Sequence, residues 1–293
     1  MTARLLRTAD GVTIALHRVR AHRDARPAAL LVHGAFSGHA IWLRPRRSGG
    51  LAHYLSSLGV DVWLADLRHH GAAAREPRAG TWRFEDLITH DAPALVARVR
   101  EETEGAPLAW IGHSSGGAVG LGWLARSEPP AALTTIVTLA TPGPVAMNVV
   151  RTTSARLAIS LSRRLGRFPA RALRLGPEDE AAGILGQWLG WNVAGGWVGT
   201  DGFDYWRALW RVRIPMLGIA GTHDWLLAPP AACRQVIDAI GSDVKQLVVA
   251  GPRLTHRTIV AGQRAHQQCW PRVATWLLER LGLARATGAA GVT

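Results

Sequence analysis

Short apolar runs alternate along most of the chain with segments that mix apolar and charged residues. We expect strands buried on both faces at residues 28–32, 60–65, 107–111, 133–140, 214–220 and 244–249. We expect helices at residues 47–58, 85–101, 115–126 and 261–281. Alternating apolar residues after the turn dipeptide Asp10-Gly11 predict an amino-terminal hairpin. Strands that alternate with helices are typical of an α/β fold, a mostly parallel sheet with helices on both faces.

The alternation breaks once, between Thr141 and Arg213, in a segment without a clear strand pattern. Its helical pieces contain Trp188, Trp191, Trp197, Trp206 and Trp210. These side chains could line a ligand pocket, and ordinary packing of a small helical subdomain explains them equally well. We interpret residues 144–213 as a helical cap inserted between two parts of one core domain, 1–143 and 214–293.

The composition is that of a folded domain, because 48% of the 293 residues are hydrophobic and 19% are charged. Basic residues outnumber acidic ones by 34 to 21, a net charge of +13 that raises the question of a nucleic-acid partner. Nearly all of this charge is arginine, Lys245 being the only lysine, and no nucleic-acid-binding motif accompanies it. We therefore expect no nucleic-acid partner. The two cysteines, Cys233 and Cys269, cannot build a disulfide framework and lack metal-ligand spacing.

Two long stretches without charged residues, 105–125 and 129–150, invite comparison with membrane helices. Glycines and prolines interrupt both, so neither is the continuous apolar helix that a bilayer requires. The first twenty residues also lack an apolar run of signal-peptide length. We expect a cytoplasmic protein.

Residues 151–174 contain seven arginines and no acidic residue. A partial apolar stripe runs through this region at Val150, Leu157, Leu161 and Leu165. Arg164 falls on the stripe, so the amphipathic pattern is imperfect. The segment is either a solvated helix face or a surface that contacts anionic lipid or aggregated polyester.

The segment Gly112-His-Ser-Ser-Gly116 matches G-x-S-x-G, in which the central Ser114 is the nucleophile. It lies between a predicted strand and a predicted helix, which is the setting that this motif requires. Side chains in place of Gly112 or Gly116 would collide with the neighbouring strand and helix. The helix that begins at Ser115 directs free amides and the positive end of its dipole toward the group that Ser114 attacks.

A serine hydroxyl needs a base and an acid that orients the base. In this strand–turn–helix arrangement the acid and then the histidine follow the serine, each just past a strand. Asp224 and His256 fit those places, after the strands at 214–220 and 244–249. Asp201, Asp204 and His266 fit less well, because the first two lie in the cap and the third on a predicted helix.

Acyl transfer also needs hydrogen-bond donors aimed at the oxyanion that forms on the substrate. The tetrapeptide His33-Gly34-Ala35-Phe36 ends another predicted strand. We expect the backbone amides of Ala35 and Ser115 to be these donors, with Phe36 as the alternate.

The sequence resembles serine hydrolases of the α/β-hydrolase family over nearly its whole length except the cap. The segments VHGAF, VDVWLADLRHHG and WRFEDLITHDAPALV resemble the acid lipases. The segment HRTIVAGQRAHQQCWPRVATWL is similar to polyhydroxyalkanoate synthases, which carry cysteine where this chain has Ser114. The resemblance implies Ser114 as nucleophile, Asp224 as acid and His256 as base. The chain departs from the family's usual Gly-His pair, because Thr255 precedes His256.

Cofactor-dependent classes fit poorly, so we expect no cofactor and no metal. The stretch 120–125 matches G-x-G-x-x-A but lies inside a predicted helix, where it cannot contact a pyrophosphate. Lys245 does not follow a glycine, which excludes a P-loop. The pair His69-His70 lacks metal-ligand spacing.

The sequence therefore predicts a carboxylic-ester hydrolase, similar to esterases and lipases, that acts on a small-molecule or lipid ester through an acyl-enzyme. Two alternatives stay open. An acyltransferase or thioesterase would use the same three residues with another acceptor or acyl group. A non-catalytic binding module would keep the fold with one of the three out of place.

Overall fold

The computed structural model describes residues 3–20, 26–45, 49–73, 81–144 and 148–283. Eight strands form one sheet with the spatial order β1-β2-β4-β3-β5-β6-β9-β10. The strands are β1 Ala3–Arg7, β2 Thr13–Arg18, β3 Ala28–Val32, β4 Asp61–Asp66, β5 Leu108–His113, β6 Leu133–Leu139, β9 Met216–Gly221 and β10 Lys245–Ala250. From β4 to β10 all neighbours are parallel, whereas β1 and β2 are antiparallel to their neighbours. The predicted hairpin and the mostly parallel sheet are confirmed.

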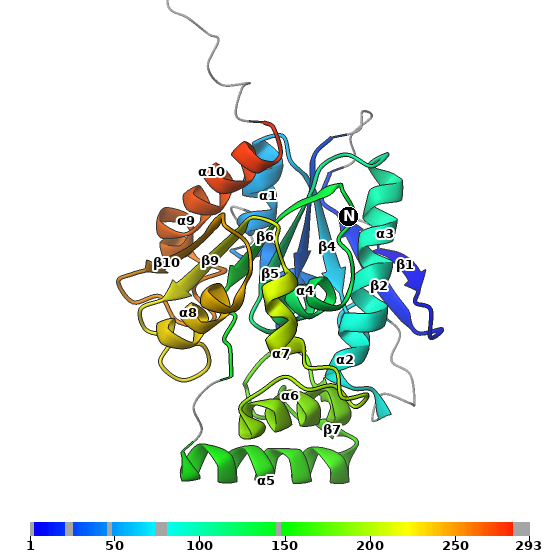
Figure 1. Ribbon diagram of the computed structural model, residues 1–293, viewed down its shortest axis with the longest axis vertical. Coiled ribbons are helices and arrows are strands. Elements are labelled where there is room, and N and C mark those ends of the chain that lie inside the picture. Colours follow the sequence, from blue (N-terminus) through cyan, green and yellow to red (C-terminus); the bar gives the residue numbers. More distant parts are fainter. Residues whose placement is uncertain (1–2, 21–25, 46–48, 74–80, 145–147, 284–293) are drawn as a thin grey trace, which may run out of the picture.

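Helices cover both faces of this sheet (Figure 1). One face packs against α3 Ala92–Glu102 and α4 Ser115–Arg126, and the other against α1 Gly50–Ser57 and α10 Trp270–Arg280. Alternate residues of a central strand serve the two cores, because successive side chains point to opposite faces. In β3, for example, Leu30 joins the first core and Leu31 the second. This two-sided burial explains why the strands are continuous apolar runs.

Several helices differ from the prediction. The expected helix 85–101 is α2 Phe84–Asp86, a π-helical turn Leu87–Asp91 and α3. The expected carboxy-terminal helix is two helices, α9 Gln263–Gln268 and α10, which meet at Cys269, two residues before Pro271. The helix expected from residue 47 begins at Gly50, and residues 47 and 48 lie outside the described part.

Helix α8 Pro230–Ala239 was not predicted, although its sequence carries the signal for it. Pro230 suits the first turn of a helix, and Cys233, Val236 and Ile237 have the spacing of one buried face.

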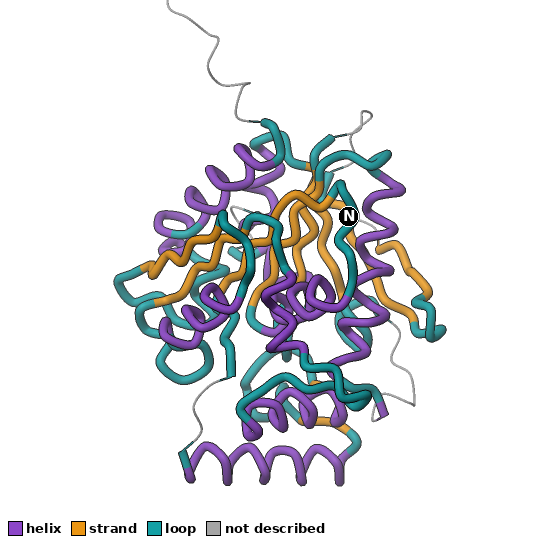
Figure 2. The backbone as a smooth tube through the Cα atoms, viewed as in Figure 1, coloured by secondary structure: helices purple, strands orange, loops and turns teal. Residues whose placement is uncertain are grey.

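The described residues of the segment expected to be a cap form three α-helices, two short strands and a 3-10 turn at Leu209–Arg211. The α-helices and strands are α5 Val149–Leu165, β7 Arg167–Phe168, β8 Glu180–Ala181, α6 Ala182–Ala194 and α7 Tyr205–Ala208. The strands pair antiparallel, although the sequence predicted no strand here. In Figures 1 and 2, α5 and α6 lie below the ends of the strands, with α6 between α5 and the core. Among the described residues, none of the helices is long and apolar enough to cross a membrane.

Candidate active site

Ser114 occupies the sharp turn between β5 and α4, with φ of 51° and ψ of −123°. A positive φ is strained for a residue with a side chain. Two hydrogen bonds hold the turn against the neighbouring strand β6 and the residues that follow it. The Ser114 amide donates to the Leu139 carbonyl at 2.9 Å, and the Thr141 hydroxyl donates to the Ser114 carbonyl at 2.9 Å. The turn thus presents the serine hydroxyl at the carboxyl edge of the sheet.

The two glycines of the motif are required by close backbone approaches, as predicted. A Cβ on Gly112 would lie 2.3 Å from the amide nitrogen of Gly117 in α4. A Cβ on Gly116 would lie 2.4 Å from the carbonyl oxygens of Val32 and His33 at the end of β3. Both distances are far shorter than van der Waals contact.

The structure brings Asp224 and His256 together with Ser114. His256 Nε2 lies 2.9 Å from Ser114 Oγ, and His256 Nδ1 lies 2.6 Å from Asp224 Oδ2. Because a carboxylate only accepts hydrogen bonds, Nδ1 carries the proton and Nε2 is free to accept one from the serine hydroxyl. This is the arrangement that makes a serine nucleophilic.

Asp224 is buried, and its second oxygen accepts hydrogen bonds from the amides of Leu227 at 3.2 Å and Ala228 at 3.0 Å. Burial alone would raise the pKa of this carboxyl, but the hydrogen bonds from His256 and the two amides lower it below its ordinary value. Asp224 is therefore ionised at neutral pH and can stabilise an imidazolium on His256.

The loops that carry the acid and the base are packed directly against each other. A Cβ on Gly221 would lie 2.5 Å from the Leu254 carbonyl oxygen, and the His223 amide donates to that oxygen at 2.8 Å. Thr255, where the family usually has glycine, shares a hydrogen bond of 2.9 Å with the Thr258 hydroxyl. With threonine at position 255 the turn is therefore still closed by a hydrogen bond, and His256 still reaches Ser114.

His113 supports this site, although nothing but its place in the motif marks it in the sequence. Its Nε2 donates to the His256 carbonyl at 2.8 Å, and its ring lies 4.9 Å from the His256 ring. Burial is the main cause that lowers the pKa of His113 to about 3, and the neighbouring His256 is the second cause. His113 is therefore neutral and fixes the backbone of the histidine loop without adding positive charge.

The expected oxyanion donors lie together at the edge of a small cavity of about 20 Å³. Ser115 is the first residue of α4, where backbone amides have no acceptor within the helix. The Ala35 amide shares its peptide plane with the Gly34 carbonyl, which accepts a hydrogen bond of 2.8 Å from His33 Nδ1. His33 therefore anchors the peptide unit that would present the Ala35 N–H. Phe36, the alternate, has a φ of 61° and contacts Phe168 of the cap.

His33 is held neutral in one tautomer. Its Nε2 accepts a hydrogen bond of 3.2 Å from the Leu67 amide, so its Nδ1 carries the proton. Burial, followed by the nearby His70, lowers the pKa of His33 to about 4. A neutral imidazole is thus fixed behind the oxyanion loop.

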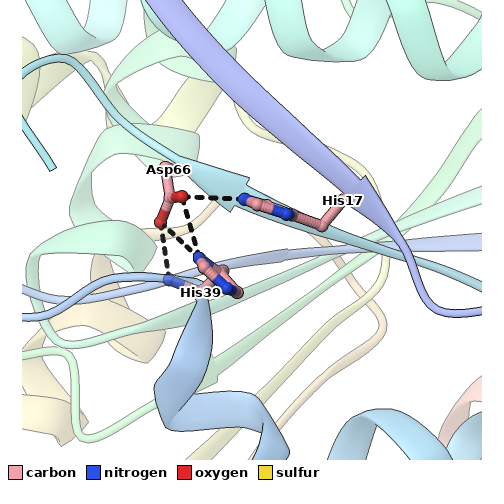
Figure 3. Close-up of side chains that lie close together, drawn as sticks. All are labelled: His17, His39 and Asp66. Atoms are coloured by element: carbon pink, nitrogen blue, oxygen red, sulfur yellow. Dashed lines mark hydrogen bonds and ion pairs between the residues drawn. The ribbon is translucent and has the colours of Figure 1, made fainter. Parts of the chain in front are cut away.

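His17, His39 and Asp66 are the one group among the described residues whose possible metal-ligand atoms lie close together (Figure 3). Asp66 accepts hydrogen bonds of 2.8 Å from His17 Nε2 and from His39 Nδ1. The imidazoles are stacked 3.7 Å apart with an angle of 24° between their planes. Because imidazole lone pairs lie in the ring plane, two stacked rings cannot direct them at one ion. The cluster instead ties the loop after β3 to β2 and β4.

The small cavity beside the oxyanion donors has mostly apolar walls. From the cap come Ile184, Leu185 and Trp188, and from the core Leu67, Phe84 and Leu87. Trp188 thus lines the cavity, whereas Trp191 and Trp197 stack on each other within the cap. Trp188 therefore fits the pocket interpretation, whereas Trp191 and Trp197 fit ordinary packing within the cap.

One buried ion pair, His70 with Glu180, joins the core to the cap in the cavity wall. His70 Nε2 lies 3.3 Å from Glu180 Oε2 in β8, and both side chains are almost fully buried. Burial alone would lower the pKa of His70, but Glu180 outweighs it and raises the pKa to about 9. The sequence excluded His69-His70 only as metal ligands, and no local pattern predicted this contact.

The three less favoured candidates for the acid and the base have other contacts. Asp201 pairs with Arg126, Asp204 caps α7 by accepting from the Arg207 amide, and His266 packs edge-on against Trp270. Cys233 and Cys269 are both free and buried.

The sheet order and the helices on both of its faces define an α/β hydrolase. A family model described as serine aminopeptidase, S33, matches residues 24–180. Because this match covers more than half of the 293 residues, the chain belongs to this family of α/β hydrolases.

Sequence relatives of this chain include lipases. Lipase member N of Mus musculus is 29% identical over 126 residues, which are 39% of this chain and 32% of that protein. Gastric triacylglycerol lipase of Bos taurus is 26% identical over 136 residues, 42% of this chain and 34% of that protein. The matches thus span about a third of the length of these relatives.

Solved structures match over nearly the whole chain. A soluble variant of monoglyceride lipase from Saccharomyces cerevisiae has a TM-score of 0.69 at 17% identity and covers 96% of both chains. An esterase from Thermogutta terrifontis has a TM-score of 0.68 at 18% identity and covers 95% of this chain and 99% of its own. At these identities the likeness concerns the fold.

Proposed function

We propose that this protein hydrolyses carboxylic esters with Ser114 as nucleophile, His256 as general base and acid, and Asp224 as the group that orients the histidine. The unbroken hydrogen-bond chain from Ser114 Oγ through His256 to Asp224 carries the proposal. The names of the sequence relatives, which are lipases, support an ester as substrate.

In the first half of the reaction, Ser114 Oγ attacks the ester carbonyl while its proton passes to His256 Nε2. The negative charge on the carbonyl oxygen is stabilised by the amides of Ala35 and Ser115. Collapse of this intermediate expels the alcohol, which takes the proton from His256, and leaves an acyl group on Ser114. Water then repeats the sequence and releases the acid.

The substrate class follows from the apolar cavity beside the oxyanion donors. Leu67, Ile184 and Trp188 favour an acyl chain or an apolar alcohol over a charged group. The cavity is small, so a substrate larger than a short ester requires movement of the cap side chains.

The test is a series of nitrophenyl esters from acetate to palmitate, measured on the wild-type protein and on Ser114→Ala. We expect hydrolysis with an optimum of chain length in the wild type and a loss of at least about a thousandfold in the variant. Labelling by a fluorophosphonate should require Ser114. Equal rates for the two proteins, or labelling of Ser114→Ala, would contradict the proposal.

A further inference from the structure

Helix α5 forms the outer layer of the cap and leaves apolar side chains uncovered (Figure 1). Only Ala155 and Ser162 of this helix are buried. Four apolar residues lie on one face of the helix: Val150, Leu157, Leu161 and Leu165. Their exposed fractions are 73%, 65%, 42% and 53%. Single exposed leucines are common on protein surfaces, but several aligned on one helix face form a patch that marks an interaction site. We call these four residues the α5 stripe.

A second group of exposed apolar side chains belongs to the loop that carries Asp224. Trp225, Leu226 and Leu227 are 76%, 65% and 54% exposed. The loop has a defined conformation, because the buried Asp224 carboxylate accepts from the Leu227 amide. Arg151, in the first turn of α5, donates to the Trp225 carbonyl at 3.3 Å. The loop therefore lies beside the amino-terminal end of α5, next to the proposed catalytic centre.

The charge around the α5 stripe is entirely positive along the helix. Arg156, Arg163 and Arg164 line a hollow on the surface of α5 together with Ile159 and Ser160. Within the part of the chain that the structure describes, none of these three arginines forms an ion pair, whereas Arg167 pairs with Asp179. Three guanidinium groups around one hollow suit a phosphate group, which accepts several hydrogen bonds.

We propose that the α5 stripe, the loop 225–227 and these three arginines form a docking surface for a bilayer that contains anionic phospholipid. The apolar side chains would enter the boundary between headgroups and acyl chains, and the arginines would bind phosphates. A polynucleotide would satisfy the arginines but leave the leucines in water. A second copy of this chain would bring two sets of unpaired arginines together, which costs free energy.

Docking on this surface places the loop that carries the proposed catalytic acid against the membrane. Binding itself does not depend on the chemistry of Ser114. Uptake of an ester directly from the bilayer, which would follow from binding, rests on the proposed function. The two proposals can therefore fail separately, and Ser114→Ala should bind vesicles as the wild type does.

The test is cosedimentation of the full chain with vesicles of phosphatidylcholine alone or of phosphatidylcholine and phosphatidylglycerol in equal parts. We expect binding to the mixed vesicles that weakens with salt, and much weaker binding to phosphatidylcholine. The triple variant R156Q/R163Q/R164Q should bind the mixed vesicles about fivefold more weakly for each arginine removed. The variant L157S/L161S should lose binding to a similar degree but keep the salt dependence of what remains.

Matched controls remove the same groups elsewhere on the surface. R7Q/R100Q/R272Q loses three exposed arginines, and L5S/L58S loses two exposed leucines, one in β1 and one at the end of α1. Circular dichroism and hydrolysis of a short soluble ester should be unchanged in L157S/L161S, because α5 does not line the cavity. Equal binding to both vesicle types, or equal losses in the controls, would overturn the proposal. A wild type that dimerises through α5 in sedimentation, with monomeric L157S/L161S, would also overturn it.

Discussion

At the scale of single residues, the proposed chemistry depends on which nitrogen of His256 carries the proton. Asp224 sets this by accepting from Nδ1 at 2.6 Å. In Asp224→Asn the amide can donate to Nδ1 instead, which moves the ring proton to Nε2 and leaves no acceptor for the Ser114 proton. We expect kcat for a soluble ester to fall about 10⁴-fold at pH 7 with little change in KM. Asp238→Asn, on the exposed side of α8, is the control and should keep wild-type kcat.

A second residue-scale prediction concerns the glycine after the nucleophile. In Gly116→Ala the new methyl group meets the Val32 and His33 carbonyl oxygens at 2.4 Å, and rigid backbone cannot yield cheaply. We expect the free energy of unfolding to fall by about 1–3 kcal/mol, measured by urea denaturation, together with a loss of activity. Gly190→Ala, in α6 with no atom near its Cβ position, should instead be neutral or slightly stabilising. Similar effects of the two substitutions would contradict this account of the glycine motif.

At the scale of elements, the sequence predicts those features that neighbouring residues in the chain determine, and it does not predict contacts between distant segments. The strand β5, the turn at Ser114 and α4 were all predicted, because apolar runs and glycine spacing are local patterns. The pair His70–Glu180 was not, since its partners come from segments 110 positions apart that meet only in the folded chain. The same is true of the cluster around Asp66 (Figure 3). The break between α9 and α10, by contrast, has a local signal that the prediction overlooked, because Pro271 suits the first turn of a helix.

The His70–Glu180 pair ties β8 of the cap to the core, and its contribution to stability should depend on pH. The pKa of Glu180 is lowered, because the positive charge of His70 outweighs burial. The contribution of Glu180 to the free energy of unfolding is therefore complete above pH 4.5 and is lost as the pH falls through the lowered pKa. The pKa of His70 is raised from 6.5 to about 9, so its contribution is complete below pH 6.5 and is lost as the pH rises through 9. Glu180→Gln should therefore lower the free energy of unfolding most between pH 4.5 and 6.5, by about 3–5 kcal/mol.

The measurement is urea denaturation of wild type and Glu180→Gln at several pH values from 5 to 9. Glu128→Gln removes an exposed carboxylate and should show no such pH dependence. A difference between wild type and Glu180→Gln that grows between pH 7 and 9 would contradict the assigned pair.

At the scale of the whole molecule, buried neutral histidines behind the proposed site should make the fold sensitive to mild acid. The pKa values of His33 and His113 are lowered from 6.5 to about 4 and about 3. Between pH 6.5 and 4.5 the unfolded chain therefore binds protons at these positions and the folded chain does not, so the free energy of unfolding falls as the pH falls. The carboxylates with lowered pKa values add to this loss only below their ordinary range, and the stabilising contribution of His70 declines only above pH 6.5. Stability should thus be highest near pH 6.5.

Each of these two histidines contributes a slope of about 1.4 kcal/mol per pH unit, so together they account for about 2.7 kcal/mol per unit between pH 6 and 5. His113→Gln keeps a side chain that can donate to the His256 carbonyl but does not titrate. Its slope in urea denaturation should therefore be about half that of the wild type. His53→Gln, on an exposed position of α1, should keep the full slope. If both substitutions leave the slope unchanged, protonation of His113 does not limit the stability of the fold, and the acid sensitivity of the molecule has another origin.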